Sequence, residues 1–225
     1  MNVNKVFKRQ LDIVKPSDLE VPILIIGAGG IGSWTTLALA KMGCSNITVV
    51  DHDAVEIHNI PSQFYKESQV NSPKVLALYD NIEEFTEVNI HSHFLKFEEF
   101  WPHKIEKEIQ DYKIIISAVD SLETRKSIWS LLKNDTSWEL YLDARMGGEL
   151  LRLLVVAANF PITIEKYEKV LNTKAKASEE VCTAKAIVYN TFLCGGLIAH
   201  IVKKFVKKEQ VKLSLIFDID QQTIL

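Results

Sequence analysis

The chain has 225 residues, of which 47% are hydrophobic and 24% charged, as in an ordinary globular protein. Its net charge of −3 gives no basic footprint for nucleic acid, and no apolar stretch reaches the length of a membrane span. No signal-peptide pattern opens the chain, and its three cysteines are too few for a disulfide framework. We therefore expect a single cytoplasmic domain over residues 1–225, with an N-terminal arm at residues 1–20, that contacts neither nucleic acid nor membrane.

Short apolar runs alternate with helical patterns along the chain. The apolar runs predict strands at Ile23–Ile26, Asn46–Val50, Asn89–Phe94, Lys113–Val119, Glu139–Ala144, Glu149–Ala157 and Lys212–Ile219. The helical spacing predicts helices at Val3–Val14, Ile31–Met42, Pro73–Phe85, Glu98–Gln110, Leu122–Lys133 and Ala184–Lys207. Residues 159–180 have no strong period and fit either a crossover loop or a short exposed helix. The alternation predicts an α/β fold with a Rossmann-like, doubly wound, mainly parallel sheet and antiparallel strands toward the C-terminus.

The first predicted strand runs directly into a glycine-rich turn and then a helix. Strand, glycine turn and helix together present backbone N–H groups and a helix N-terminus to a phosphate. The next apolar run ends at Asp51, about 20 residues beyond the last glycine, where a ribose-binding carboxylate is expected. Asp120 and the Asp143–Gly148 turn also follow predicted strands. These positions converge on a nucleotide site, and the glycines alone fit either a dinucleotide or ATP.

Several further short motifs follow the glycines in a specific order. The chain reads GAGGIGS from Gly27, DHDAV from Asp51, NIPSQ from Asn59, SPK at residues 72–74, and SAVD at residues 117–120 with Arg125 after it. Together they resemble the ThiF/MoeB/HesA-type adenylyltransferases, which are relatives of the ubiquitin-activating enzymes. The resemblance is strong over about residues 5–130 and loose over the remainder.

The resemblance implies an activity that depends on ATP and Mg²⁺. Such enzymes adenylate the C-terminal glycine of a small ubiquitin-like or sulfur-carrier protein ending in Gly-Gly, and they act as homodimers. The implied nucleotide-binding residues are Gly27, Gly29, Gly30, Gly32, Asp51, Asp53, Asn59, Gln63 and Lys74. Lys74 would reach the triphosphate, Asp120 would coordinate Mg²⁺, and Arg9 would enter the neighbouring subunit's site.

Two departures from the family pattern concern charge and metal. The family usually carries N-x-x-R-Q, but here Ser62 stands in place of the arginine. Losing a cation aimed at developing charge costs about 2–4 kcal/mol of transition-state stabilisation. Arg9, Arg125 and Arg145 are candidates to substitute for it. The paired C-x-x-C motifs that bind structural zinc in many relatives are absent.

Two further features each leave two interpretations open. The Asp143–Gly148 turn would line an incoming Gly-Gly tail, or it is a strand connection with glycines at positive φ. Cys182 matches a family cysteine that accepts the activated carboxylate as a thioester, or it is a small hydrophobe buried at a helix start.

Two other functions stand beside adenylation. An NAD-dependent oxidoreductase would explain the glycines and Asp51 but leave Asn59, Gln63, Lys74 and Asp120 without a role. A non-catalytic family member that binds a nucleotide or a partner is the other alternative, and Ser62 favours it.

Overall fold

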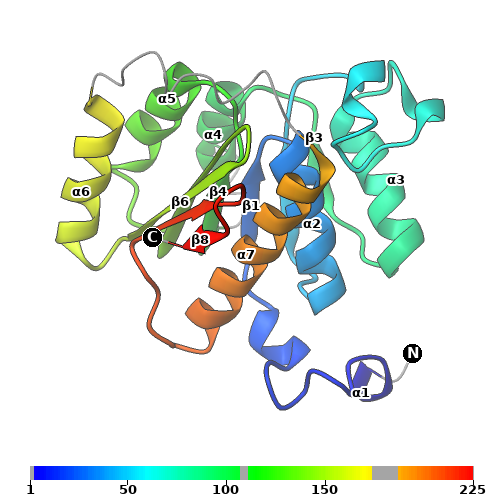
Figure 1. The fold of residues 1–225 in the computed structure, drawn as a ribbon, viewed down its shortest axis with the longest axis horizontal. Coiled ribbons are helices and arrows are strands. Elements are labelled where there is room, and N and C mark those ends of the chain that lie inside the picture. Colours follow the sequence, from blue (N-terminus) through cyan, green and yellow to red (C-terminus); the bar gives the residue numbers. More distant parts are fainter. Residues whose placement is uncertain (1–2, 107–110, 174–186, 225) are drawn as a thin grey trace.

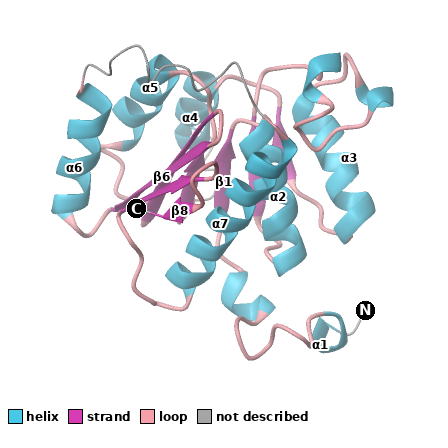
Figure 2. Ribbon diagram, in the orientation of Figure 1, coloured by secondary structure: helices cyan, strands magenta, loops and turns pink. Residues whose placement is uncertain are grey.

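The computed structural model describes residues 3–106, 111–173 and 187–224, and their strands form one eight-stranded sheet covered by helices on both faces (Figures 1 and 2). The strands are β1 (Ile23–Ile26), β2 (Ile47–Val50), β3 (His91–His93), β4 (Ile114–Ser117), β5 (Leu140–Gly147), β6 (Leu150–Ala157), β7 (Ser214–Asp218) and β8 (Thr223–Ile224). The α-helices are α1 (Val3–Val6), α2 (Gly30–Met42), α3 (Lys74–Thr86), α4 (Phe97–Glu106), α5 (Leu122–Leu132), α6 (Pro161–Asn172) and α7 (Val188–Val206). In these described parts of the chain, no helix is both long and apolar enough to cross a membrane.

The sheet order is β3-β2-β1-β4-β5-β6-β7-β8, and it confirms the predicted fold class. Strands β3, β2, β1, β4 and β5 are parallel, whereas β6, β7 and β8 extend the sheet in antiparallel fashion. From β1 the chain winds outward through β2 to β3, and then returns to β4 on the other side of β1. The switch point, at which the strand order reverses, therefore lies between β1 and β4. Open α/β sheets bind their ligands at such a point.

Strand β1 explains why the central runs are wholly apolar. All four of its residues are buried, because successive side chains point to opposite faces and each face is covered. Ile23 and Ile25 enter the core that includes residues of α2, α3 and α7, whereas Leu24 and Ile26 enter the core that includes residues of α4, α5 and α6.

Several element boundaries differ from those predicted. The helix predicted at Val3–Val14 is only Val3–Val6, followed by turns. Helix α3 begins at Lys74, because Pro73 has an extended backbone at the N-cap. Strand β5 continues to Gly147, which pairs with Leu150, so the connection is a tight turn with Gly148 at φ 59°.

The C-terminal part holds two elements that the sequence did not specify and one that begins later. The segment without a strong period contains α6, whose buried Thr163, Tyr167 and Leu171 recur every four residues. That periodicity was obscured by the surrounding lysines and glutamates. Strand β8 was not predicted, and α7 begins at Val188, with residues 184–186 outside the described part of the chain.

Helix α7 packs closely across α2 beside the sheet (Figure 1). A Cβ atom on Gly195 would lie 2.9 Å from the backbone carbon of Trp34 and 3.0 Å from the backbone nitrogen of Thr35. A Cβ atom on the adjacent Gly196 would have no atom within 4 Å. The absence of a side chain at Gly195 therefore sets how closely the two helices approach.

These adjacent glycines give a matched pair of variants. Gly195→Ala should lower the free energy of unfolding by about 1–3 kcal/mol, because the methyl group overpacks the α2–α7 contact. Gly196→Ala should raise it by up to about 1 kcal/mol, because alanine favours helix and meets open space. Urea denaturation measures both changes, and equal effects of the two variants would contradict the packing described.

Candidate functional site

A cavity of about 630 Å³ lies at the carboxyl ends of the parallel strands, over the switch point. Its volume is within the range of small-molecule sites, about 300–1,000 Å³. The cavity wall includes these predicted site residues: Gly27, Gly29, Gly30, Asp51, Asp53, Gln63, Lys74 and Asp120. The structure therefore brings together most of the residues singled out in the sequence.

The glycines of the turn have different physical reasons to be glycine. Gly27 has a φ of 97°, and a Cβ there would lie 2.7 Å from the carbonyl oxygen of Ala118. A Cβ on Gly32 would lie 1.8 Å from the carbonyl oxygen of Gly27, so the fold itself requires both glycines. A Cβ on Gly30 would lie 2.9 Å from Thr191 of α7.

Gly29 is the exception, since no atom lies within 4 Å of a Cβ built there. Packing thus leaves open space at Gly29, in the wall of the cavity and directly before α2. The first turn of α2 presents N–H groups that have no acceptor within the helix. These groups and the helix dipole favour an anion at this point.

Asp51 fixes the glycine turn from the end of β2. Its two carboxylate oxygens accept backbone N–H groups from Ala28, at 2.6 Å, and from Asp53, at 2.7 Å. The residue is only 9% exposed. Because each carboxylate oxygen has a second lone pair, Asp51 can still accept hydrogen bonds from the hydroxyl groups of a ligand.

Lys74 stands at the start of α3 and is held against Asp53. Its Nζ lies 2.9 Å from Asp53 Oδ2, and its backbone N–H donates to the Asp53 carbonyl. The Lys74 side chain is 10% exposed, whereas that of Asp53 is 52% exposed. An ammonium group has three donors, so this ion pair leaves Lys74 able to donate to a ligand in the cavity.

The segment from Ser62 to Tyr65 is tied to the glycine turn and to α2. The Tyr65 hydroxyl donates to the Ala28 carbonyl at 2.6 Å, and Trp34 Nε1 donates to the Ser62 carbonyl at 2.9 Å. Burial, with the nearby charges of Asp51 and Asp53, raises the pKa of Tyr65 well above its usual value. The hydroxyl therefore stays protonated as a donor. These two hydrogen bonds hold the 62–65 segment against the glycine turn and α2.

Gln63 lies within this tied segment and lines the cavity. Its Oε1 atom is buried and has no hydrogen-bond partner among the described residues. A buried polar atom of this kind costs free energy unless it is paired. A hydroxyl or amino group of a bound ligand would satisfy it.

Four predicted site residues are not in the described cavity wall, and one of them is Gly32, in the first turn of α2. Asn59 is buried beside it, where its Oδ1 accepts the Glu56 N–H at 2.9 Å and closes a short 3₁₀ turn. Arg9 is exposed in the turns that follow α1. Cys182 lies outside the described residues.

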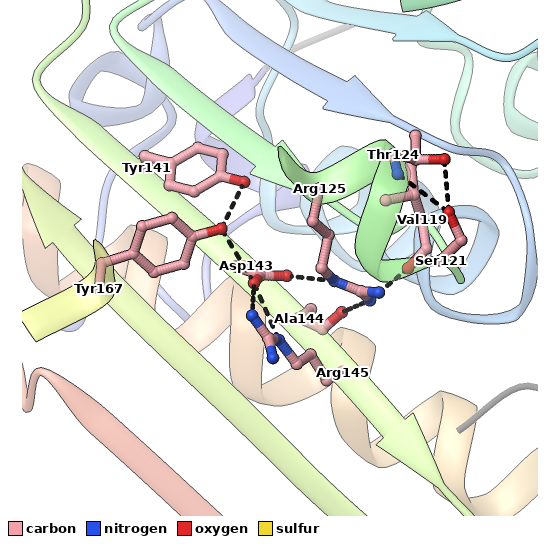
Figure 3. Close-up of polar contacts among 9 residues, drawn as sticks. All are labelled: Val119, Ser121, Thr124, Arg125, Tyr141, Asp143, Ala144, Arg145 and Tyr167. Atoms are coloured by element: carbon pink, nitrogen blue, oxygen red, sulfur yellow. Dashed lines mark hydrogen bonds and ion pairs between the residues drawn. The ribbon is translucent and has the colours of Figure 1, made fainter. Parts of the chain in front are cut away.

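Asp120 is exposed in the loop between β4 and α5, and it forms part of the cavity wall. Arg125, one turn into α5, is buried behind this loop and also lines the cavity. Its Nη2 donates to the carbonyls of Val119 and Ala144, and its Nε donates to Asp143 Oδ1 at 2.8 Å (Figure 3). Arg125 thereby ties the Asp120 loop to β5.

The Asp143–Gly148 segment is not an open turn along the cavity. Asp143 is fully buried in an ion-pair network with Arg125 and Arg145, and Met146 is the member of this segment that lines the cavity. The sequence had left its role undecided. Within the described structure, the segment supports the cavity from behind.

Sequence reasoning missed the cavity wall formed after β3. The residues concerned are Leu95, Lys96, Phe97, Glu98 and Glu99, which connect β3 to the start of α4. They follow the carboxyl end of a predicted parallel strand. Asp51 and Asp120 were located by the rule that open α/β sheets bind ligands at the carboxyl ends of their strands. The same rule would have found these residues, but their side chains carry no recognisable nucleotide motif.

Comparison with known proteins decides the family. The model of the ThiF family matches residues 17–222, which is most of the chain. The chain belongs to the ThiF family. The motifs from which the sequence predicted this membership lie around the cavity just described.

Curated relatives match about half of this chain. The NEDD8-activating enzyme E1 catalytic subunit of Arabidopsis thaliana is 37% identical over 113 residues, which are 48% of this chain and 23% of that protein. The adenylyltransferase and sulfurtransferase MOCS3-2 of Zea mays is 36% identical over 110 residues, which are 47% of this chain and 22% of that protein. The matched stretch thus spans less than a quarter of either relative.

Solved structures share the fold over the whole chain. Escherichia coli MccB, solved with AMPCPP and MccA, superposes with a TM-score of 0.74 and 17% identity, covering 100% of this chain and 71% of MccB. PaaA gives a TM-score of 0.74 with 18% identity, covering 100% of this chain and 74% of PaaA. At these identities the likeness establishes the architecture alone.

The tie between Tyr65 and the glycine turn can be tested by removing one hydroxyl. Tyr65→Phe should lower the free energy of unfolding by about 1–3 kcal/mol, because the Ala28 carbonyl loses its buried donor. Tyr79→Phe removes a hydroxyl that bonds to Asn89 near the surface and should cost less than about 0.5 kcal/mol. Urea denaturation distinguishes them, and a neutral Tyr65→Phe would show that the hydroxyl does not hold the turn.

Proposed function

We propose that this protein is an ATP- and Mg²⁺-dependent adenylyltransferase that activates the C-terminal glycine carboxylate of a small ubiquitin-like or sulfur-carrier protein. One observation carries the proposal: a single cavity gathers the glycine turn with Asp51, Gln63, Lys74 and Asp120. A dinucleotide site would use the turn and Asp51 only. The names of the curated relatives, an activating enzyme and an adenylyltransferase, support the same function.

The proposed nucleotide position follows from the wall of the cavity. Asp51 would accept the ribose hydroxyls, and the phosphates would lie at Gly29 and the N-terminus of α2. Lys74 would donate to the triphosphate, and the unpaired Oε1 of Gln63 would accept from a group of the bound ligand. The open space at Gly29 and the orphan oxygen of Gln63 both fit a ligand of this kind.

Asp120 is the proposed Mg²⁺ ligand, because it is an exposed carboxylate residue in the cavity wall and hard cations prefer oxygen ligands. Asp51, His52 and Asp53 also bring ligand atoms within 4.8 Å of one another. However, the Asp51 oxygens accept backbone N–H groups, and Asp53 is paired with Lys74. Asp120 is therefore the better donor, and the metal would neutralise charge on the departing pyrophosphate.

The reaction joins a carboxylate oxygen of the partner to the α-phosphorus of ATP and breaks the bond to the β-phosphate, releasing pyrophosphate. Its barrier depends on cations and backbone dipoles that oppose the repulsion of two anions. Ser62 supplies no such cation. Of the three arginines proposed to replace it, Arg125 lines the cavity, Arg145 lies behind it, and Arg9 is exposed in the described chain. We assign the compensating charge to Arg125 together with Lys74.

The remaining parts of the proposal rest on the family resemblance. A homodimer would let Arg9 of one subunit reach the site of the other, and Cys182 would accept the activated carboxylate as a thioester. We take residues 1–225 as one adenylation domain with an arm at residues 1–20. The proposed setting is the cytoplasm, where unpaired cysteines are ordinary.

ATP–pyrophosphate exchange tests the function directly. The purified protein, mixed with a panel of small proteins ending in Gly-Gly, should incorporate labelled pyrophosphate into ATP with at least one of them. Asp120→Asn should lower the exchange rate about 100-fold or more, because the variant removes the charged ligand that would hold Mg²⁺ and, with it, the cation that would neutralise the phosphates.

The matched control is Glu123→Gln, which removes an exposed carboxylate three residues away that does not line the cavity. It should leave exchange within about twofold of the wild type, as surface changes usually do. Exchange that is insensitive to Asp120→Asn would contradict the assignment of the metal ligand. ATP binding without exchange across the whole panel would favour the non-catalytic alternative.

A further inference from the structure

The loop that carries Asp120 is fixed on both sides of that residue. Before it, the Val119 carbonyl accepts from Arg125 Nη2. After it, Ser121 Oγ accepts the Thr124 N–H at 3.0 Å as the N-cap of α5 (Figure 3). The Asp120 side chain is exposed and has no hydrogen bond or ion pair with the described residues. The backbone on either side therefore sets where this carboxylate lies.

Asp143 determines how Arg125 reaches the loop. Arg125 Nε donates to Asp143 Oδ1 at 2.8 Å, and its Nη2 donates to the Ala144 carbonyl at 3.1 Å as well as to Val119. A guanidinium group is planar and holds its N–H donors in a fixed fork. Because Asp143 fixes the Nε end of the fork, it also fixes the direction of Nη2, which joins β5 to the loop.

The other oxygen of Asp143 is bound by groups from β5 and α6. Oδ2 accepts from Arg145 Nε at 2.9 Å, from Arg145 Nη2 at 2.7 Å and from the Tyr167 hydroxyl at 3.1 Å (Figure 3). Burial raises the pKa of Tyr167, so its hydroxyl stays protonated as a donor. These bonds hold the carboxylate in one orientation, with Oδ1 toward Arg125.

This ion network is a poor source of stability. Asp143 is fully buried and Arg125 is only 5% exposed. Removing two ions from water offsets most of their attraction, so apolar side chains of similar volume often give equal or greater stability. Charged hydrogen bonds add direction, because they fix a guanidinium group in one geometry. Here that geometry is the one that holds the Asp120 loop.

We propose that Asp143 is a positioning residue: it orients Arg125, and Arg125 in turn holds the loop at the place from which Asp120 binds Mg²⁺. This inference rests on the proposed function. Mg²⁺ requires near-ideal octahedral geometry with short bonds to oxygen, so a ligand on a loosened loop binds it weakly. Loss of the Asp143 charge should therefore reduce the benefit that Mg²⁺ gives to ATP binding.

Calorimetric titration tests this without turnover, as the ratio of the ATP dissociation constant in EDTA to that in Mg²⁺. We expect a ratio of at least ten for the wild type, and one at least fivefold lower for Asp120→Asn and Asp143→Asn. Arg125→Lys keeps the positive charge but loses the fork, so it should lower the ratio too, and it serves where Asp143→Asn does not fold. A smaller folded fraction changes the stoichiometry of the titration, not this ratio.

Hydrogen exchange followed by mass spectrometry examines the loop without any nucleotide. The amides of Ala118, Thr124 and Arg125 are hydrogen-bonded around it, so they should exchange at least fivefold faster in Asp143→Asn. The matched control is Arg145→Gln, which breaks the other ion pair of Asp143 and leaves the bonds of Arg125 in place. It should change neither the exchange of the loop nor the ratio of ATP dissociation constants.

Equal effects of Asp143→Asn and Arg145→Gln on both measurements would overturn the inference, because Asp143 would then serve only the stability of the network. A normal ratio in Asp143→Asn and Arg125→Lys, beside a low ratio in Asp120→Asn, would overturn it as well. A normal ratio in Asp120→Asn would instead refute the metal ligand of the proposed function. Hydrogen exchange would still decide whether Asp143 positions the loop.

Discussion

The site depends on one short hydrogen bond, from the Ala28 N–H to Asp51 Oδ2 at 2.6 Å. This bond joins the end of β1 to the end of β2 and fixes the glycine turn from inside. Tyr65 holds the same residue from the other side by donating to the Ala28 carbonyl. Because both backbone groups of Ala28 are occupied, the turn keeps Gly29 and the start of α2 facing the cavity. The turn is therefore pre-organised before any ligand arrives.

Much of the fold and part of the site could be predicted from the sequence, because local patterns encode them. Continuous apolar runs such as Ile23–Ile26 occur where a strand is covered on both faces, and the glycines are dictated by contacts such as that between Gly27 and Ala118. Asp51 and Asp120 each follow a parallel strand, and the carboxyl ends of parallel strands meet at the same edge of the sheet. Helix α6 was left undecided because its three buried positions are surrounded by charged residues.

What the sequence could not provide is the pairing of charges. Asp143 and Arg145 look like a loop motif in the sequence, but the hairpin register buries Asp143 and sets Arg145 opposite Arg152. The sequence offers Arg125 as a candidate for the missing cation, but it does not reveal that the guanidinium joins the Asp120 loop to β5. Such contacts link positions far apart in the chain, so spacing alone does not reveal them.

The central claim is that the cavity binds ATP, with its phosphates at Gly29. Calorimetric titration with ATP and Mg²⁺, and separately with NADH, tests this claim for the wild type and for Gly29→Ala. The account predicts saturable ATP binding, much weaker NADH binding, and weaker ATP binding in Gly29→Ala without a loss of melting temperature, since a Cβ there meets no protein atom within 4 Å. Tighter binding of NADH, or unchanged ATP binding in Gly29→Ala, would contradict it.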